Sequence, residues 1–266
     1  MENVCYYDRL KIHYKLVGEG NCIVLLHGYL ENLKIWDGFC EELSTNYHVV
    51  VPDIPIHGKS ECEVDVNTID GMSDSISVLL DYLKVPKACL VGHSMGGYVA
   101  LSLADRHPEK ISGVCLFNST PYADSPEKKQ NRLLEIEAVK QGKKAAVVSN
   151  AIPLRFATRN LCVKKHLVDW AVDVAMCTSD FGVVDSLKAM ASRSDLNHVL
   201  SNAGFPTMMV FGELDNHIPM DVARQLEERH KKTRTVYLHN SGHMGFLEEK
   251  DQALNAIRSF AACVFN

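Results

Sequence analysis

The chain has 266 residues, of which 46% are hydrophobic and 23% charged, with a formal net charge of -5. This length suffices for one α/β domain or two small ones with a sizeable core. The charge offers no basic surface for nucleic acid, and no apolar run is long enough to cross a membrane. The first residues show no signal peptide, and nine unclustered cysteines are typical of free thiols in a reducing cytoplasm. We therefore expect a cytoplasmic globular protein without nucleic-acid or membrane partners.

The first half of the chain alternates between short apolar runs and amphipathic segments. Residues 10–17 alternate in polarity and predict an antiparallel edge strand. An unbroken apolar run at 22–26 predicts a buried strand, and further strands are predicted at 47–51, 88–91 and 111–117. A helix that Asn32 can cap follows the first of these runs, and Ile69 to Leu83 has helical spacing. This alternation predicts a parallel sheet with helices on both faces.

The alternation of predicted strands and helices stops after residue 120. Residues 121–203 lack strand-like runs and have helical periodicity, so we expect a helical cap inserted into a core formed by 1–120 and 204–266. The alternative is that these helices pack beside the sheet and touch no substrate. The alternation then resumes, with predicted elements at 207–211 (strand), 220–230 (helix), 233–238 (strand) and 248–262 (helix).

The stretch from Ala88 to Arg106 predicts a strand, a sharp turn and a helix, with Gly92-His93-Ser94-Met95-Gly96 at the turn. A serine at the apex of such a turn has strained backbone angles, and side chains two residues away on either side would collide with the backbone. The helix that follows directs N–H groups toward the same place, where they favour a developing oxyanion. Ser94 is therefore a candidate nucleophile.

A serine hydroxyl needs a base and an orienting carboxylate. His243 is the best candidate base, because it lies in a Gly-flanked loop directly after a predicted strand. His93 should point away from the nucleophile, and His239 lies near a strand end. The competitors on predicted strands or helices are His13, His48, His107, His166, His198 and His230. Asp215 follows the strand 207–211 and is the candidate acid, with Glu213 as its competitor. The order Ser94, Asp215, His243 is the order expected for this architecture.

An oxyanion hole requires two converging N–H donors. Met95 offers one because it follows the nucleophile. The other is expected from the loop after residues 22–26, where we choose the Tyr29 N–H. For His27, in the same loop, we favour a structural role over a catalytic one.

Together, His27-Gly28, Asp53 with His57-Gly58-x-Ser60, the Ser94 motif, Gly212-x-x-Asp215 and Gly242-His243 resemble the α/β-hydrolase fold superfamily. The resemblance implies an eight-stranded, mostly parallel sheet and an acyl-enzyme mechanism. Ile56 departs from the pattern, since related sequences usually have glycine there. The serine nucleophile differs from the aspartate of dehalogenases and epoxide hydrolases that share the fold.

The expected function is cleavage of a small carboxylic ester, a small-molecule substrate, through an acyl-enzyme on Ser94, without a cofactor or metal. Similar motifs also occur in C–C bond hydrolases, in the pyruvate-eliminating lyase of menaquinone synthesis, and in non-catalytic binders of small ligands. Arg155 and Arg159 could hold a substrate carboxylate, although a solvated helix face is favoured. The cap could offer a pocket, or simply pack, with Phe156, Trp170, Met176, Phe181 and Met190. The sequence leaves the oligomeric state open.

Overall fold

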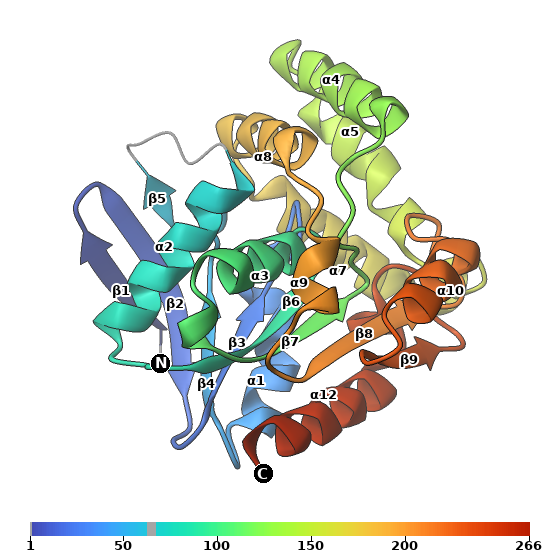
Figure 1. Ribbon diagram of the computed structural model, residues 1–266. Helices are drawn as coiled ribbons and strands as arrows, with labels where there is room; N and C mark the ends of the chain where they lie inside the picture. Colours follow the sequence, from blue (N-terminus) through green and yellow to red (C-terminus); the bar gives the residue numbers. More distant parts are fainter. Residues whose placement is uncertain (1, 63–67) are drawn as a thin grey trace.

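The centre of the molecule is a single sheet, seen in the computed structural model, which describes residues 2–62 and 68–266 (Figure 1). Eight strands of this described part follow one another in the order β1-β2-β4-β3-β6-β7-β8-β9, and the two-residue β5 pairs with β2 beside this row. The strands are β1 (Glu2–Tyr7), β2 (Leu10–Val17), β3 (Cys22–Leu26), β4 (His48–Pro52), β5 (Glu61–Cys62), β6 (Ala88–His93), β7 (Ile111–Phe117), β8 (Thr207–Gly212) and β9 (Arg234–Leu238). The expected mostly parallel sheet is confirmed, because β4, β3, β6, β7, β8 and β9 pair in parallel.

One strand prediction was wrong. Residues 10–17 form β2, but β2 lies inside the sheet between β1 and β4, and the edge strand is β1. The sequence did not reveal β1 because five of its six residues are exposed or only half-buried, which leaves little alternation to recognise. A turn with Asp8 in the left-handed region joins the two strands.

Helices cover both faces of the sheet, as expected (Figure 1). On one face, α2 (Ile69–Tyr82) and α3 (Met95–Arg106) pack against the strands and against each other. On the other face lie α1 (Asp37–Leu43) and α12 (Lys250–Phe265). Asn32 caps the short 3-10 turn η1 (Leu33–Trp36) that precedes α1, with its side chain accepting a hydrogen bond from the Lys34 N–H.

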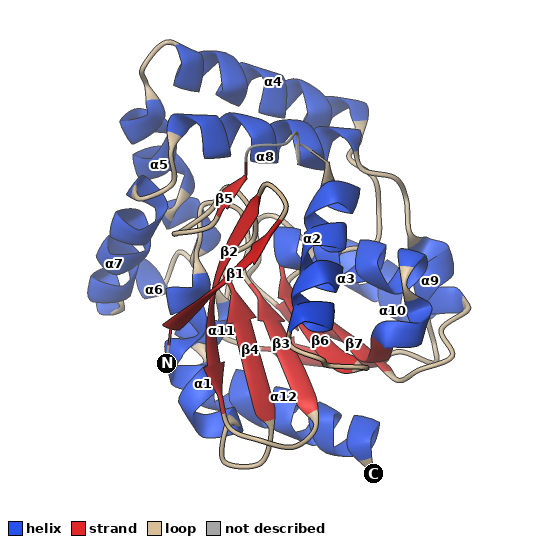
Figure 2. Cartoon of the chain, turned by 90° about the vertical axis from the view of Figure 1, so that its left-hand side faces the viewer, coloured by secondary structure: helices blue, strands red, loops and turns tan. Residues whose placement is uncertain are grey.

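Between β7 and β8 the chain forms helices, which we call the α4–α9 segment. Its elements are α4 (Pro126–Lys140), α5 (Lys144–Ala151), η3 (Pro153–Arg155), α6 (Asn160–Val163), α7 (Lys165–Met176), α8 (Asp180–Ser192) and α9 (Asn197–Ser201). In Figure 2, α4 and α8 lie above one end of the strands, stacked on each other. The remaining elements are η2 (Pro108–Lys110), α10 (Met220–Arg229) and α11 (Gly245–Glu248).

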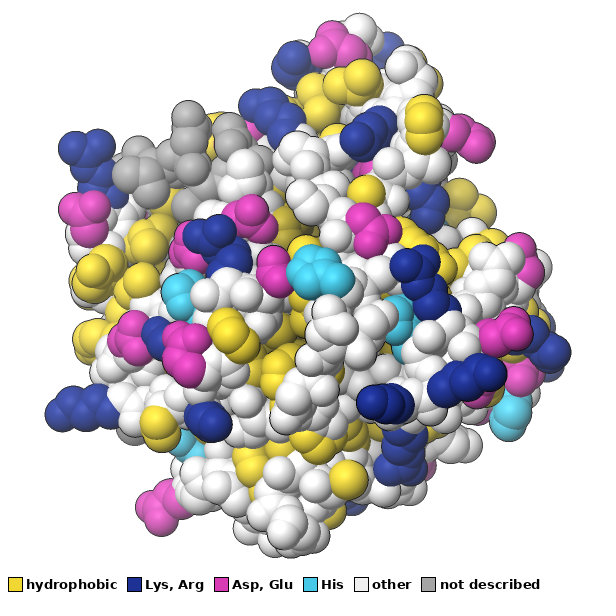
Figure 3. All heavy atoms as spheres, viewed as in Figure 1, with side chains coloured by type: hydrophobic (Ala, Val, Ile, Leu, Met, Phe, Trp, Pro, Cys, Tyr) yellow, Lys and Arg dark blue, Asp and Glu magenta, His cyan; other side chains and the backbone are white. Residues whose placement is uncertain are grey.

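The parallel pairing brings the residues that follow β3, β6, β7, β8 and β9 to one edge of the sheet. The loops that contain Tyr29, Ser94, Asp215 and His243 therefore lie at this edge. Within the described chain, no helix has the length and apolar character needed to span a bilayer. On the face shown in Figure 3, basic and acidic side chains are interspersed over the described surface.

Candidate active site

Ser94 occupies the turn between β6 and α3 with a left-handed backbone, at φ 49° and ψ -114°. A Cβ on Gly92 would strike the carbonyl oxygen of Gly96, and a Cβ on Gly96 would strike the backbone of Leu26 and His27. The flanking glycines are therefore required by close backbone approach, as the sequence indicated. This strained turn leaves the Ser94 side chain half-buried at the carboxyl edge of the sheet.

The structure brings Ser94, His243 and Asp215 together. His243 Nε2 lies 2.9 Å from Ser94 Oγ, and His243 Nδ1 lies 2.8 Å from Asp215 Oδ2. Because a carboxylate only accepts, Nδ1 donates its proton to Asp215 and Nε2 is left to accept the proton of the serine hydroxyl. This is the geometry of a general base aimed at a hydroxyl nucleophile.

The surroundings shift the pKa values of both Asp215 and His243. Burial alone would raise the pKa of Asp215, but the charge and hydrogen bond of His243 and the His217 N–H outweigh it and hold this pKa well below its usual value. Burial lowers the pKa of His243 because the imidazolium loses its hydration, and Asp215 only partly offsets this. The histidine is consequently neutral, and able to accept a proton, at neutral pH.

Two further residues of the site were missed from the sequence. Asn118, directly after β7, donates its side-chain N–H to Asp215 Oδ2 at 2.9 Å, and its position after a buried strand was an available signal. The ring of His217 stacks on that of His243, with centroids 4.8 Å apart. The backbone N–H groups of His217 and Ile218 donate to Asp215 Oδ1, so that they, Asn118 and His243 together satisfy the buried carboxylate.

The predicted oxyanion donors lie in two loops at the same edge. Met95 is the first residue of α3, so its N–H has no intrahelical acceptor. Tyr29 lies in the loop after β3, and β3 pairs with β6 so that Leu26 is opposite Gly92. The Gly28 N–H of this loop donates to the buried Glu31 side chain. The role of the Tyr29 and Met95 N–H groups stays a prediction.

The competing residues have other partners. Glu213 pairs with the exposed His239 at 2.9 Å and not with His243. His93 points away from Ser94, with its ring nitrogens near Glu31 and the His243 carbonyl. His27 accepts a hydrogen bond from the Ile54 N–H, which is a structural contact.

The expectation of a solvated helix face for Arg155 was wrong. Arg155 is buried, and its guanidinium donates to the Tyr29 carbonyl at 2.7 Å and lies 3.6 Å from Glu31. It was misjudged because its partners are far away in the sequence. Arg159 is engaged at the surface, where it donates to the His239 carbonyl and to Asn240.

The five large apolar side chains expected from the inserted segment differ in their surroundings. Phe156 and Met190 are fully buried, so they pack within the protein, whereas Phe181 is 59% exposed. Phe181 lines a groove beside Ile56.

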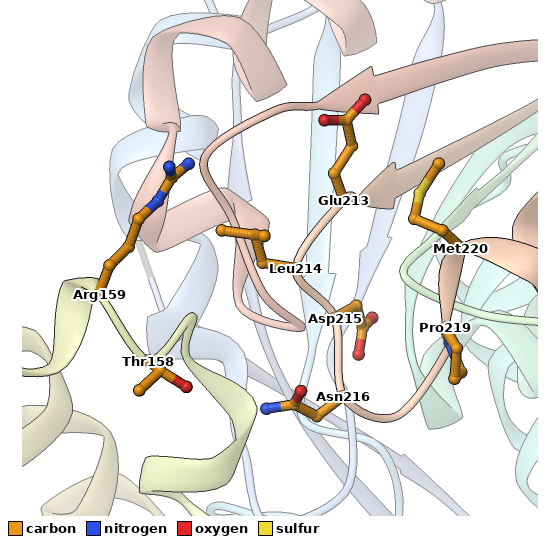
Figure 4. A pocket seen from close by; sticks show the side chains of 8 residues that line it. All are labelled: Thr158, Arg159, Glu213, Leu214, Asp215, Asn216, Pro219 and Met220. Carbon is orange, nitrogen blue, oxygen red and sulfur yellow. The ribbon is translucent and has the colours of Figure 1, made fainter.

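Two cavities adjoin the loop that contains Asp215. One, of about 470 Å³, lies on the side of Arg159 and Glu213, and the described residues that line it include neither Ser94 nor His243 (Figure 4). The other, of about 580 Å³, is lined by residues that include His217, Ile218, Thr120 and Lys128. The described residues that line it also include neither Ser94 nor His243, but its wall contains His217, whose ring stacks on that of His243.

Asp215, His217 and His243 also offer ligand atoms within 4.8 Å of one another, a spacing that a metal ion could use. Two of these groups, however, already bond each other through Asp215 Oδ2 and His243 Nδ1. The acid–base pair accounts for this cluster without an ion.

A parallel sheet that presents serine, aspartate and histidine in this chain order is the arrangement of the α/β-hydrolase class. A sequence model of the alpha/beta hydrolase fold family matches residues 21–250, and the chain belongs to this family.

Relatives and solved structures agree with this assignment. The acetyltransferase component of the acetoin cleaving system of Pseudomonas putida is 30% identical over 95% of this chain, which spans 66% of that protein. A pimeloyl-[acyl-carrier protein] methyl ester esterase of Aeromonas hydrophila is 24% identical over 94% of this chain and 99% of its own length. The structure of a thermophilic esterase from Thermogutta terrifontis superimposes with a TM-score of 0.92, at 25% identity over 97% of this chain and 95% of that one.

Proposed function

We propose that the protein hydrolyses small carboxylic esters, in the manner of a carboxylesterase, through an acyl-enzyme on Ser94. The observation that supports this most is the continuous hydrogen-bonded chain from Ser94 through His243 to Asp215. The esterases among the relatives and solved structures support the same reaction class. In this proposal the catalytic residues are Ser94, His243 and Asp215.

The reaction follows from the geometry. His243 Nε2 accepts the proton of Ser94 while Oγ attacks the ester carbonyl carbon, and the N–H groups of Tyr29 and Met95 donate to the oxyanion. His243 then gives this proton to the departing alkoxide, which leaves as the alcohol. A water molecule, deprotonated by His243, attacks the acyl-enzyme, and the acid is released as Ser94 regains its proton.

The cavity of about 580 Å³ is our candidate for the place where the substrate approaches. Its volume is within the range of small-molecule sites, and its lining combines apolar side chains, such as Ile218 and Val222, with several polar and charged ones. The α4–α9 segment contributes Lys128 to its wall, which supports the interpretation of this segment as a cap.

Replacing the nucleophile tests the proposal. We expect Ser94→Ala to abolish hydrolysis of short p-nitrophenyl esters and labelling by a fluorophosphonate, because the attacking oxygen is lost while the fold is kept. Ser44→Ala, which removes a surface hydroxyl bonded to the Glu41 carbonyl, is the matched control and should behave as the wild type. Circular dichroism checks that both variants fold.

Ester turnover by a folded Ser94→Ala protein would contradict the proposal. Turnover of a panel of esters, lactones and diketone-like C–C substrates by the wild-type protein then identifies the type of bond that it cleaves. Turnover confined to the C–C substrates would replace the ester assignment by a C–C hydrolase. A wild-type protein that turns over none of the panel and resists labelling would be a ligand binder.

A further inference from the structure

Beside the Ser94 turn lies a buried cluster of three ionisable residues from three parts of the chain. Glu31 comes from the loop after β3, His93 is the last residue of β6, and Arg155 ends η3 in the α4–α9 segment. Their exposed fractions are 2%, 0% and 6%. Burying charge is costly unless the charges are paired, so this cluster requires an explanation.

The hydrogen bonds of His93 define its protonation state. Its Nδ1 lies 2.9 Å from Glu31 Oε2, and its Nε2 lies 3.0 Å from the backbone carbonyl oxygen of His243. A carbonyl oxygen only accepts, and an ionised carboxylate only accepts. If Glu31 is ionised, both ring nitrogens must therefore donate, and His93 is an imidazolium.

The alternative is a neutral pair, in which protonated Glu31 donates to His93. Arg155 opposes this arrangement, because its guanidinium lies 3.6 Å from Glu31 Oε1, an oxygen with no hydrogen-bond partner among the described residues. The Gly28 N–H also donates to Oε2, at 2.5 Å. Burial by itself raises the pKa of Glu31, but His93, Arg155 and the Gly28 N–H outweigh it and lower this pKa to about 2.

Other groups facing His93 do not change this conclusion. The rings of Phe117 and Phe246 pack on it edge to face and bear no charge. The His243 ring lies with its centroid 5.1 Å away, and His27 is near enough to interact electrostatically. Burial lowers the pKa of both of these histidines, so both are neutral beside His93 at neutral pH.

Arg155 also holds the two loops of the reaction centre directly. Its guanidinium donates to the Tyr29 carbonyl at 2.7 Å, and its own carbonyl accepts the His243 N–H at 2.6 Å. His93 in turn donates to the His243 carbonyl. The backbone of His243 is thus fixed from both sides, and the Tyr29 loop is fixed by Arg155 and Glu31.

We propose that Arg155 is a positioning residue through which the α4–α9 segment sets the geometry of the reaction centre. It keeps Glu31 ionised and His93 doubly protonated, so that His93 and Arg155 together hold the Tyr29 and His243 loops. Two cations and one carboxylate leave one net positive charge beside the Ser94 turn, where it favours an oxyanion. The expected effect on kcat rests on the proposed ester hydrolysis, whereas the charges of Glu31, His93 and Arg155 do not depend on it.

The kinetic test compares two arginines of the same segment whose side chains bond different loops: Arg155 bonds the Tyr29 loop, and Arg159 bonds residues 239 and 240. Arg155→Met should lower kcat about 100-fold with KM little changed, because a small displacement of the reacting groups has an effect of this order. Arg159→Ala is the control, since Arg159 bonds the His239 carbonyl and Asn240 at the surface, and should keep wild-type kcat. Arg155→Lys retains the cation and should recover part of the loss.

The second test is independent of activity. In protein with isotope-labelled histidine nitrogens, NMR should show both His93 nitrogens protonated at neutral pH in the wild type and in Arg155→Lys. In Arg155→Met, His93 should lose one of these protons. Glu31→Gln should have the same effect, and it provides the test if Arg155→Met does not fold. His93→Asn identifies the signal.

A kcat in Arg155→Met equal to that of Arg159→Ala would overturn the proposal. So would a His93 that keeps both protons in the folded Arg155→Met or Glu31→Gln protein. If wild-type protein cleaves no ester but shows the expected His93 signals and their loss in the variants, the proposed substrate class fails and the charge arrangement stands.

Discussion

At the scale of single residues, the hydrogen bonds of the candidate site determine where its protons lie. Asp215 accepts four hydrogen bonds, from His243, Asn118 and the N–H groups of His217 and Ile218, and has no remaining use for a proton. His243 is then left with one free lone pair, at Nε2, directed at Ser94. Burial keeps this imidazole neutral, which is the state that a general base requires.

The pH dependence of kcat/KM tests this arrangement. A base must be unprotonated to act, so lowering its pKa extends activity to lower pH. Because the pKa of His243 is below the usual 6.5, we expect the acid limb of the profile to have its midpoint below pH 6.5.

Replacing the carboxylate tests the same environment. Asp215→Asn should reduce kcat about 10⁴-fold, since the amide can hold His243 in the wrong tautomer.

Both effects can be measured with a short p-nitrophenyl ester, and an ester with a different leaving group controls for ionisation of the product. An acid limb centred above pH 6.5, or an Asp215→Asn variant close to wild-type activity, would contradict the assigned environment of His243.

The residues that were predicted from the sequence are marked by neighbouring residues in the chain, whereas those that were missed are defined by contacts with distant residues. Ser94, Asp215 and His243 each follow a recognisable strand within a few residues, so the motif and chain order suffice to nominate them. Arg155 sits in a helical segment whose composition resembles a solvated face, and its contacts come from residues 29, 31 and 243. Only the folded arrangement of the α4–α9 segment over the sheet reveals them.

At the scale of elements, the loop between β4 and β5 links the α4–α9 segment to the Tyr29 loop. His57 packs edge to face on His27 and lies 3.2 Å from the Ser186 hydroxyl of α8. Ile56 has φ +67° and is buried, although a β-branched residue in this region is strained. At position 56, where related sequences usually have glycine, the backbone thus has a conformation that glycine adopts without strain.

Substitutions at Ile56 should reveal this strain. Both Ile56→Ala and Ile56→Gly remove the buried side chain, but only glycine adopts φ +67° without a steric cost, so Ile56→Gly should be more stable by about 1 kcal/mol. Urea unfolding measures the difference. Ile54 is a matched control, because it is fully buried and is not among the described residues with positive φ. There the order should reverse, with alanine more stable than glycine; Ala above Gly at both positions would contradict a strained Ile56.

At the scale of the whole molecule, the α4–α9 segment and the sheet share buried hydrogen bonds. Glu248 of α11 accepts from the Ala157 N–H and the Asn160 side chain on the segment and from the Gly242 N–H beside His243. Arg155 makes comparable bonds to the Tyr29 and His243 loops. Separating the two parts would leave these polar groups unpaired, which costs about 1–3 kcal/mol for each group that stays buried.

We therefore expect the segment and the sheet to unfold together, and the two tryptophans of the chain can report on them separately. Trp36 is fully buried beside the sheet, whereas Trp170 is half-buried in α7. Trp170→Phe leaves Trp36 as the only indole, and Trp36→Phe leaves Trp170. In each variant the fluorescence transition in urea should coincide with the loss of helix seen by circular dichroism.

Comparing the two signals within each variant removes the effect of the substitution on overall stability. If the Trp170 signal changed at a lower urea concentration than the helix signal of the same protein, the segment would open on its own. Arg155 could then position the reaction centre only while the segment is closed, and kcat would fall in urea before the sheet unfolds. Coincident transitions would instead mean that the loops around Ser94 keep their geometry until the molecule unfolds as a unit.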